Sequence, residues 1–356
     1  TYNTLPLRLS YSQPFTSYNE MKWRKKMEPK EYERAKRIYC ESIESIAIRV
    51  ASLYFAAISA QSDYNQSVTK LKDLEDLYAM SQKRLSLGTI TKGDLLQLEL
   101  SMLNAKVTRN EAQVKMNDAF YDLFSYMRVS HDEKVILLPP ENVIEQVLNV
   151  NEVLQKAMNN SSHAIGQDLD LLSAQQNLAK AKAAQGIQMQ LNAEVGFNRT
   201  ADGFASAYSH LQDNESIGLT ISVPIFDWGV KKGRVMVAKS NLELAKTKKE
   251  QADNDYVQSI KREVMQFSLQ AEQCRTSQRA QKISEERYEI TKKRFETGNV
   301  SVTELNTALQ ELETAKAQYI GQLQSYWNYY YTLRKFTLYD WVEHKDLIAD
   351  FEALVK

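Results

Sequence analysis

Two carboxylates, Asp94 and Glu304, follow hydroxyl side chains in the same way. Each lies three residues after its partner, Thr91 or Ser301, in the pattern of a capping box that begins a helix. A pair of carboxylates can also perform acid–base catalysis, but only when the two groups lie within about 10 Å of each other in a cleft. No nucleophile, histidine or cofactor-binding loop accompanies either carboxylate. The sequence therefore does not favour an enzyme.

Residues that bind metals or perform redox chemistry are sparse. Cys40 and Cys274 have no CxxC neighbour, and the four histidines are scattered at positions 131, 163, 210 and 344. Neither arrangement has the spacing of a metal site or a redox motif. We expect no metal, no catalytic thiol and no cofactor, and we expect both cysteines to remain unpaired.

The overall composition is that of an ordinary folded protein. The 356 residues are 43% hydrophobic and 25% charged, with 45 basic and 45 acidic side chains, so nucleic acid is not an expected partner. Only 11 Gly and 6 Pro interrupt long stretches of helix-forming residues. No segment approaches the roughly 18 consecutive apolar residues of a membrane-spanning helix, and we expect none. The chain begins at Thr1 without a signal-like leader, and we expect a mature or truncated product.

The chain contains two related halves. Gly88 and Gly298 lie 210 residues apart. The same offset relates Arg84 to Arg294, Tyr78 to Tyr288, Leu95 to Leu305, and "LSYSQP" to "LTISVP". Pro14 precedes Gly88 by 74 residues, and Pro224 precedes Gly298 by 74 residues. An offset that holds over this distance predicts helices of equal length in both halves, and a period this long indicates a duplicated half-molecule.

Each half has the apolar pattern of a coiled-coil hairpin. In the first half the seam is Ile43, Ile46, Val50, Leu53, Ala57, Ala60, Tyr64, Leu71, Leu74, Tyr78 and Leu85, followed by Leu95, Leu98, Met102, Ala105, Ala112, Met116, Ala119, Leu123 and Tyr126. The last nine of these match, position for position, Leu305, Ala308, Leu312, Ala315, Gln322, Tyr326, Tyr329, Leu333 and Phe336. Gly88 and Gly298 suit the left-handed position after a helix, so they mark the tips of hairpins over 27–128 and 228–337. The roughly 60 residues before each tip form a helix on the order of 90 Å long.

Three segments in 1–15 and 190–226 alternate between apolar and polar residues. Each has about the ten residues of a transmembrane β-strand, and the second and third flank the polar stretch "ADGFASAYSHLQDNES" as a hairpin. Three strands cannot close a barrel, and an open edge is not viable in lipid. The strands therefore form either a small sheet packed on helices or one part of a barrel built by several subunits.

The order of these elements resembles the TolC-like outer-membrane efflux factors, the outer membrane efflux protein family. The resemblance rests on "VPIFDWGVKKGRV" after a strand, on "YEITKKRFETGNVSVTELNTALQELETAKAQY", on the duplicated halves, and on a helix over 152–185 that contains "VLQKAM". It implies a mainly α fold with a small β part, in which a homotrimer forms one barrel in the outer membrane and an α-barrel tunnel in the periplasm. It also implies a periplasmic adaptor and an inner-membrane pump as partners.

The resemblance extends to the remaining segments. Family members supply two strands per half, so a leading helix and first strand are expected to be missing before Thr1. Pro14 and Pro224 mark strand-to-helix transitions. The segments 129–189 and 338–356 correspond to an equatorial linker, helix and C-terminal segment, with 131–143 as the linker between the halves.

The resemblance places the periplasmic gate at the second hairpin tip. Glu304 falls where an acid lines the entrance, Thr307 where a second acid often stands, and Val300 where a basic residue can occur. Asp94 is the matching candidate on the first tip. The turns at Gly88, Thr91, Gly298 and Ser301 are expected to contact partners. Alternatively, Asp94 and Glu304 only complete capping boxes, and both roles can coexist.

Three functions remain to be compared. A channel requires outward apolar faces on all three strands and a detergent-dependent trimer. A periplasmic scaffold or adaptor would use the same rods to bind partner helices without a pore, and it would be stable without detergent. An enzyme would need the two carboxylates in one cleft. The outward Leu, Ile, Val and Phe residues of the strands favour the channel.

Overall fold

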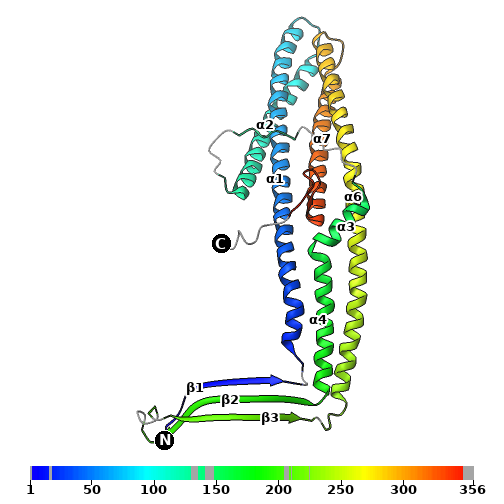
Figure 1. Cartoon of the computed structure of the whole chain (residues 1–356). Coiled ribbons are helices and arrows are strands. Elements are labelled where there is room, and N and C mark those ends of the chain that lie inside the picture. Colours follow the sequence, from blue (N-terminus) through cyan, green and yellow to red (C-terminus); the bar gives the residue numbers. More distant parts are fainter. Residues whose placement is uncertain are drawn as a thin grey trace. The chain divides into compact units, whose positions relative to one another are not determined.

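The structure is a computed structural model that describes residues 2–15, 18–129, 135–140, 148–203, 208–209, 211–223 and 225–347. The chain divides into two compact units (Figure 1). The first comprises Thr1–Ile38 and Ser162–Tyr256, and the second comprises Tyr39–Ser161 and Val257–Lys356. The expected division into membrane, tunnel and equatorial parts uses other boundaries and stays a prediction.

The first unit contains an antiparallel sheet with strand order β1-β2-β3. The strands are β1, Tyr2–Pro14, β2, Gln188–Ala201, and β3, Gln212–Ser222. The three expected strands and the β2–β3 hairpin are therefore confirmed. β3 begins inside the segment that we expected to be a polar linker, because its residues Gln212 to Ser216 continue the pairing with β2.

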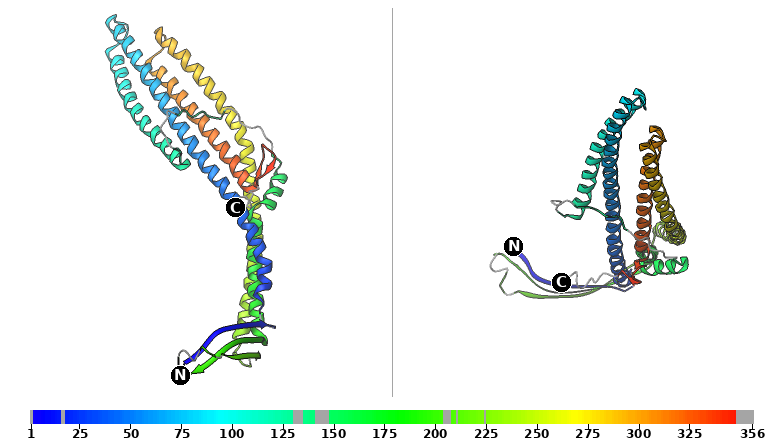
Figure 2. Two further views of the ribbon diagram at one scale, coloured as in Figure 1. Left: turned by 60° about the vertical axis from the view of Figure 1, so that its left-hand side comes forward. Right: turned by 90° about the horizontal axis from the view of Figure 1, so that it is seen from above.

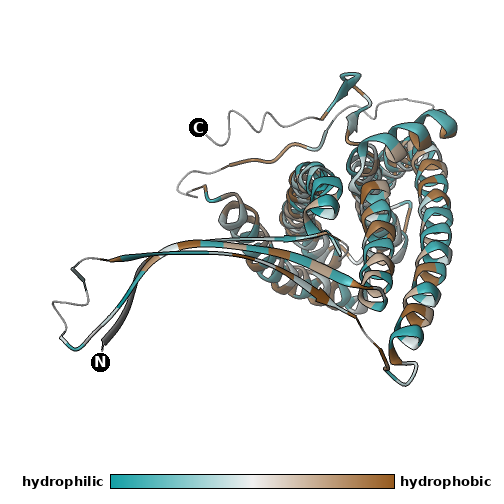
Figure 3. Ribbon diagram, turned by 60° about the horizontal axis from the view of Figure 1, so that its bottom comes forward, coloured by the Kyte–Doolittle hydropathy of each residue, from teal (hydrophilic) through white to brown (hydrophobic). Residues whose placement is uncertain are grey.

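One face of this sheet is apolar and the other is polar, because side chains alternate along each strand. On the apolar face Leu9 lies opposite Val195. On the polar face Arg8 forms an ion pair with Glu194. The apolar side chains face outward from the sheet, with Leu9 73% exposed and Ile217 82% exposed. Figure 3 shows the alternation along the strands.

A carboxylate joins the three helical segments of the first unit. The helices are α1, Glu20–Ser86, α4, Ser162–Gln185, and α6, Val230–Glu296. Asp168 of α4 accepts hydrogen bonds from Lys249 of α6 at 2.9 Å and from Lys30 of α1 at 3.1 Å. The hydrogen bond from Lys249, together with that from Lys30, holds the pKa of Asp168 below its ordinary value.

The helices of the two halves have the same lengths. α1 and α6 have 67 residues each. α2, Lys92–Met127, and α7, Val302–Thr337, have 36 residues each. Each boundary of α6 and α7 lies 210 residues after the matching boundary of α1 and α2. The equal-length hairpins that the constant offset predicts are therefore confirmed.

In the second unit the four helices follow the order α2, α1, α7, α6, with α2 and α6 at the edges (Figure 2). Lys70 of α1 forms an ion pair with Glu313 of α7 at 3.1 Å, so these two helices are direct neighbours. All four helices contribute to one apolar cluster, which contains Leu74, Leu77, Leu98, Ala105, Tyr288, Phe295, Leu305, Ala308 and Leu312.

The heptad seam expected for α1 is partly wrong. Ala57 and Leu74 are buried as expected, but Ile43 and Ile46 are 45% and 53% exposed, and Glu44 is buried instead. α1 lies between α2 and α7 and buries two faces, so a single heptad stripe does not describe it. The seams expected for α2 and α7 are largely confirmed, with Leu98, Ala105, Ala112, Leu123, Leu305, Ala308, Leu312, Ala315, Tyr326 and Leu333 buried.

The helix expected over 152–185 is in fact two helices. α3 is Val150–Asn160, and α4 begins at Ser162. Ser161 between them has extended backbone angles, φ −76° and ψ 163°. The local sequence Asn-Asn-Ser-Ser explains the break, because short polar side chains hydrogen-bond to nearby backbone groups and favour helix ends over helix interiors.

A buried polar cluster anchors the C-terminal end of α7. Arg334 lies 3.0 Å from Glu44 of α1 and 3.0 Å from Asp340. Tyr330 donates a further hydrogen bond to Asp340 at 3.0 Å. Asp340 belongs to a short hairpin of β4, Tyr339–Asp340, and β5, Lys345–Asp346. Burial raises the pKa of Glu44, although Arg334 opposes this effect.

α1 is apolar enough by composition to span a membrane. One 18-residue window has a mean hydropathy of 1.5 and no more than two charged residues. Our expectation that no helix spans a membrane considered only uninterrupted apolar runs, and it stays a prediction. Core helices of packed proteins have the same composition, so the window by itself does not indicate a membrane span.

Candidate functional site

The first hairpin tip is a tight turn closed by its own side chains. Gly88 has a left-handed φ of 69°, as expected for the residue after a helix. Thr91 caps α2 by accepting a hydrogen bond from the backbone N–H of Asp94 at 3.1 Å. The Asp94 carboxylate in turn accepts from the Thr91 backbone N–H at 3.2 Å and from the Thr91 hydroxyl at 2.8 Å. The expected capping box is complete, and it engages Asp94.

The second tip repeats the turn but leaves its carboxylate free. Gly298 has a φ of 83°. Ser301 accepts a hydrogen bond from the backbone N–H of Glu304 at 3.2 Å. Within the described part of the chain, the exposed Glu304 carboxylate makes no hydrogen bond or ion pair. The complete capping box expected here is therefore wrong, because the longer Glu side chain extends into solvent instead of folding back.

The other two gate positions differ in their surroundings. Thr307 is exposed three residues after Glu304, on the same side of α7. Its hydroxyl donates to the Thr303 carbonyl at 2.9 Å. Val300 instead packs against the apolar cluster of the four helices. A basic side chain at position 300 would have to point away from that cluster. Because this chain has Val300 there, position 300 supplies no cation near Glu304.

Arg84 joins the two tips, a role that its place in the repeat does not indicate. Its guanidinium donates to the carbonyl of Glu296 at 2.6 Å and to that of Phe295 at 3.4 Å. Both carbonyls lie at the C-terminal end of α6, where backbone acceptors lack helical partners and the helix dipole favours a cation. A cleft of about 470 Å³ separates the tips, lined by Arg84, Asp94 and Ser301 among others.

A second contact between the halves is buried beneath the tips. The hydroxyl of Tyr288 donates to Asp73 at 2.6 Å, and Lys292 lies 2.7 Å from the same carboxylate. Burial, followed by the hydrogen bond to Asp73 and then the charge of Asp73, raises the pKa of Tyr288 above its ordinary value. This network holds α6 against α1.

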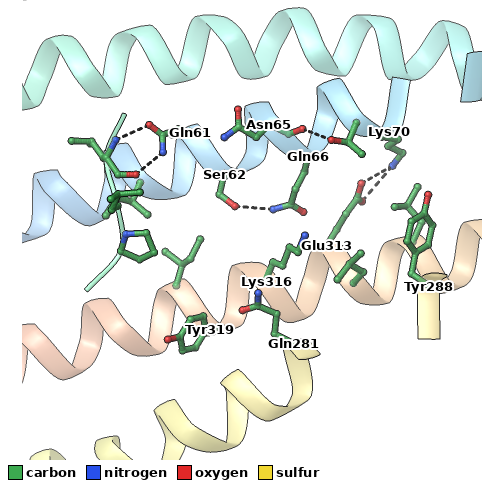
Figure 4. A pocket seen from close by; sticks show the side chains of 18 of the residues that line it. Gln61, Ser62, Asn65, Gln66, Lys70, Gln281, Tyr288, Glu313, Lys316 and Tyr319 are labelled. Carbon is green, nitrogen blue, oxygen red and sulfur yellow. Dashed lines mark hydrogen bonds and ion pairs between the residues drawn. The ribbon is translucent and has the colours of Figure 1, made fainter. Parts of the chain in front are cut away.

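A cavity of about 490 Å³ lies between α1 and α7 (Figure 4). Lys70 and Glu313 bridge it, and Lys316 points into the same space. Gln61 binds the segment 135–140 by donating to the Leu137 carbonyl at 2.8 Å and accepting from its N–H at 3.0 Å. The side chains that line this cavity are mixed polar and apolar, and the paired charges neutralise each other.

The strand-to-helix transition is built by "FDWG". The Asp227 carboxylate accepts from the backbone N–H groups of Lys231 at 2.9 Å and Gly229 at 3.1 Å. These hydrogen bonds, that from Lys231 first, hold the pKa of Asp227 below its ordinary value. Pro14 ends β1 as expected, whereas Pro224 lies outside the described residues.

The described part of the chain offers no centre for metal or thiol chemistry. It contains no group of three His, Cys, Asp or Glu side chains that could hold a metal ion. Histidines 131 and 210 lie outside it, as do parts of the expected linker at 131–143 and the end of the C-terminal segment. Cys40 and Cys274 are free and buried. Burial raises the pKa of Cys274 to about 11, so this thiol stays protonated at neutral pH.

Comparisons with known proteins agree with this arrangement. The family profile described as "Outer membrane efflux protein" matches residues 160–337. A membrane protein from Pseudomonas aeruginosa superposes with a TM-score of 0.74 at 13% identity, over 92% of this chain and 76% of that one. The Campylobacter jejuni CmeC outer membrane channel gives 0.74 at 16% identity, over 97% of this chain and 72% of that one.

The open state of the Neisseria gonorrhoeae MtrE outer membrane channel has the same fold. Its TM-score is 0.70 at 15% identity, over 94% of this chain and 80% of that one. No curated protein matches the sequence. At these identities the structural matches establish the fold, and the profile match over half of the chain supplies the family.

Proposed function

Because this chain belongs to the outer membrane efflux protein family, we propose that it is the outer-membrane channel of a tripartite efflux or type I secretion system. The family consists of channels and not of enzymes, and the chain is an outer-membrane protein with an efflux role. In the proposed system it conducts small molecules or exported substrates from a periplasmic pump complex to the outside. A periplasmic adaptor and an inner-membrane pump are its proposed partners.

The sheet, with one apolar and one polar face, supports the proposal of a barrel built by several subunits. Its outward apolar residues, such as Leu9 and Ile217, suit contact with lipid, and its polar face suits a water-filled lumen. β1 and β3 are the edges of the described sheet. Unpaired backbone groups at an edge cost several kcal/mol each in lipid, so we propose that a homotrimer builds one barrel to which each copy contributes such a sheet. The barrel would use 1–15 and 190–226.

The long hairpins support a tunnel with a gate at its tips. We propose that 27–128 and 228–337 form the tunnel and that 129–189 and 338–356 surround its middle. Three copies of Glu304 would then line the entrance, with Thr307 beside them, since no capping contact engages the Glu304 carboxylate. Asp94 completes the N-terminal cap of α2 and adds little to the charge at the entrance. The turns at Gly88, Thr91, Gly298 and Ser301 would contact the adaptor.

The test combines subunit number with conductance. Light scattering in detergent should report three subunits, and the purified protein should conduct ions across a planar bilayer. Leu219→Lys places a charge on the apolar face of β3, where a lipid-facing cation costs about 2–4 kcal/mol, and it should abolish insertion. The matched control is Thr220→Lys on the polar face, which should insert and conduct.

Two outcomes would contradict the proposed channel. A stable monomer in detergent-free buffer would favour the periplasmic scaffold. Equal insertion of the Leu219→Lys and Thr220→Lys variants would show that the apolar face of the sheet does not meet lipid.

A further inference from the structure

Basic side chains gather where the three helices of the first unit meet the strands. α1 and α6 begin there and α4 ends there, each beside the antiparallel sheet (Figure 1). The segments 20–26, 178–187 and 225–235 contain nine basic and two acidic residues, whereas the whole chain has 45 of each sign. At about 1.5 Å per residue, all nine lie within about 10 Å of a helix end. The nine form what we call the basic collar: Lys22, Arg24, Lys25, Lys26, Lys180, Lys182, Lys231, Lys232 and Arg234.

The charge of the basic collar is largely uncompensated. Glu20 pairs with Arg24 at 3.2 Å, and both side chains are more than half exposed. The other acid, Asp227, accepts hydrogen bonds from the backbone N–H groups of Gly229 and Lys231. Within the described chain, the remaining eight basic side chains form no ion pair. The basic collar therefore carries a net positive charge that no carboxylate of the described chain neutralises.

The positions of these cations oppose the local stability of two helices. The N-terminal end of a helix favours anions and disfavours cations, yet α6 begins with Lys231 and Lys232 and has no acidic residue in its first turn. Lys232 and Arg234 lie two residues apart. The same pair recurs 210 residues earlier, as Lys22 and Arg24 near the start of α1. Both halves thus keep cations where the helix disfavours them, and an external anion would offset this cost.

Exposed aromatic side chains lie between the strands and the basic collar. Phe226 and Trp228 are 73% and 86% exposed, and their ring centroids lie 4.6 Å apart in an edge-to-face arrangement. Phe15, directly after β1, is 60% exposed. The Lys26 ammonium lies over the Trp23 ring, 5.2 Å from its centroid. Aromatic rings beside long basic side chains are typical of the interface between a membrane and water.

These features follow one another in a fixed order along β3 and α6. The exposed apolar residues of the strand end at Val223. Phe226 and Trp228 come next, and the basic residues begin at Lys231. A lipid leaflet has the same order, from hydrocarbon through the interface to the headgroups. We propose that the basic collar binds the phosphate groups of anionic phospholipids in the leaflet that faces the periplasm.

The charge of the basic collar decides the class of lipid. A zwitterionic headgroup, such as that of phosphatidylcholine, has no net charge and gains little from the eight unpaired cations. An anionic surface instead strengthens binding by about fivefold for each nearby Lys or Arg. The long side chains can cover aromatic surface with their stems while their charged ends reach the phosphates. The inference rests on the proposed barrel and adds a lipid preference to it.

Quenching of tryptophan fluorescence by brominated lipids tests this preference. Every protein carries Trp23→Phe, so Trp228 reports on the basic collar, while Trp327 and Trp341 of the second unit give a constant background. Phosphatidylcholine vesicles contain equal amounts of either brominated phosphatidylglycerol or brominated phosphatidylcholine. Phosphatidylglycerol should bind at least about fivefold more strongly than phosphatidylcholine. The ratio should approach one in about 1 M salt, where the Debye length is about 3 Å.

A triple substitution next to Trp228 locates the preference. The variant with Lys231→Gln, Lys232→Gln and Arg234→Gln should bring the binding ratio close to one. It should also fold, because cations disfavour this end of the helix. The matched control removes two Lys and one Arg from exposed positions farther along α6 and should leave the ratio unchanged: Lys261→Gln, Arg279→Gln and Lys282→Gln.

The outcomes separate this inference from the proposed function. A protein that conducts ions but is quenched equally by the two lipids would overturn the lipid preference and leave the channel intact. Equal losses in both triple variants would also overturn it, because the preference would then follow total charge. Quenching by neither lipid in a conducting protein would assign the basic collar to an acidic protein surface instead. A protein that inserts into neither kind of vesicle, as judged by flotation, would overturn both proposals.

Discussion

The two halves of the chain have helices of the same lengths but different tips. In the first half, Asp94 accepts two hydrogen bonds from Thr91 and completes the cap of α2. In the second half, Ser301 caps α7 without help from the Glu304 side chain. The shared backbone turn is independent of this difference, since Gly88 and Gly298 have similar φ values of 69° and 83°. The duplication preserved the geometry of the turn while leaving one carboxylate available to solvent.

The halves also differ in the surfaces that they present to each other. Beside the shared apolar cluster, the halves contact each other inside the chain through the ion pairs Glu44–Arg334 and Lys70–Glu313. The equivalent of Arg334 in the first half is Phe124, and the equivalent of Glu313 is Leu103. The duplicated half therefore does not repeat the charges of Glu313 and Arg334, because Leu103 and Phe124 stand at the equivalent positions.

Breaking the buried polar cluster should have the largest effect. Arg334→Met leaves the carboxylates of Glu44 and Asp340, 6% and 7% exposed, buried without their cation. The free energy of unfolding should fall by about 3–5 kcal/mol, measured by urea unfolding and far-UV circular dichroism. Lys246→Met is the control, because its ion pair with Glu243 is more than half exposed and should contribute less than about 1 kcal/mol. Equal losses would contradict the account.

Replacing either tip glycine by Ala should lower the stability by the same amount, and by less than Arg334→Met does. Gly88→Ala and Gly298→Ala place a side chain in a left-handed conformation, which costs about 1–2 kcal/mol. An added Cβ would have no neighbour within 4 Å at Gly88 and only the Arg84 guanidinium at 3.8 Å at Gly298, so the cost comes from the backbone. Gly321→Ala, in the open interior of α7, should instead stabilise by about 0.5–1 kcal/mol. Thermal unfolding compares the three variants.

The tip carboxylates should differ in what they contribute to stability. Asp94→Ala removes two hydrogen bonds with Thr91, whereas Glu304→Ala removes none within the described chain. Both variants lose the same favourable interaction with a helix N-terminus. Asp94→Ala should therefore destabilise by about 1 kcal/mol more than Glu304→Ala. Identical unfolding midpoints would mean that the two caps are equivalent.

The smallest expected effect is on the stability of the first unit at low pH. The folded-state pKa of Asp168 lies below its ordinary value of 3.8, because Lys249 and Lys30 favour the charged carboxylate. The contribution of Asp168 to the free energy of unfolding is present above pH 3.8 and is lost as the pH falls through the lowered pKa. Asp168 is 45% exposed, so solvent screening limits this to less than about 1 kcal/mol.

Thermal unfolding in acid would reveal the Asp168 contribution. Between about pH 5 and pH 3, the unfolding temperature should fall further for the unmodified protein than for Asp168→Asn. Glu44 should have the opposite dependence on pH. Its contribution to the free energy of unfolding decreases as the pH rises, because burial raises its pKa. A steeper fall for Asp168→Asn would mean that the carboxylate is not stabilised by its two lysines.

Local patterns in the sequence predicted the parts of the fold that depend on local chemistry. The 210-residue offset predicted the equal helices, and alternation predicted the sheet. The Asn-Asn-Ser-Ser break also has a local signal, since its side chains favour helix ends, and it was missed because the flanking apolar pattern continues. The sequence also predicted the positions of both tips.

Contacts between helices distant in sequence could not be predicted in the same way. The burial of Glu44 depends on Arg334, 290 residues away. The role of Arg84 depends on carbonyl groups at the end of another helix, which have no side-chain signature. The capping pattern also could not tell that Asp94 folds back while Glu304 extends, because both residues fit the same motif.

The most direct test of the proposed entrance is the reversal potential of single channels under a potassium chloride gradient. In the proposed trimer, three copies of Glu304 would lie around the threefold axis and attract cations. The unmodified protein and Asp94→Asn should therefore prefer cations, whereas Glu304→Gln should lose that preference with little change in stability. Equal shifts for Asp94→Asn and Glu304→Gln, or no shift for Glu304→Gln, would contradict the assignment of the entrance to the second tip.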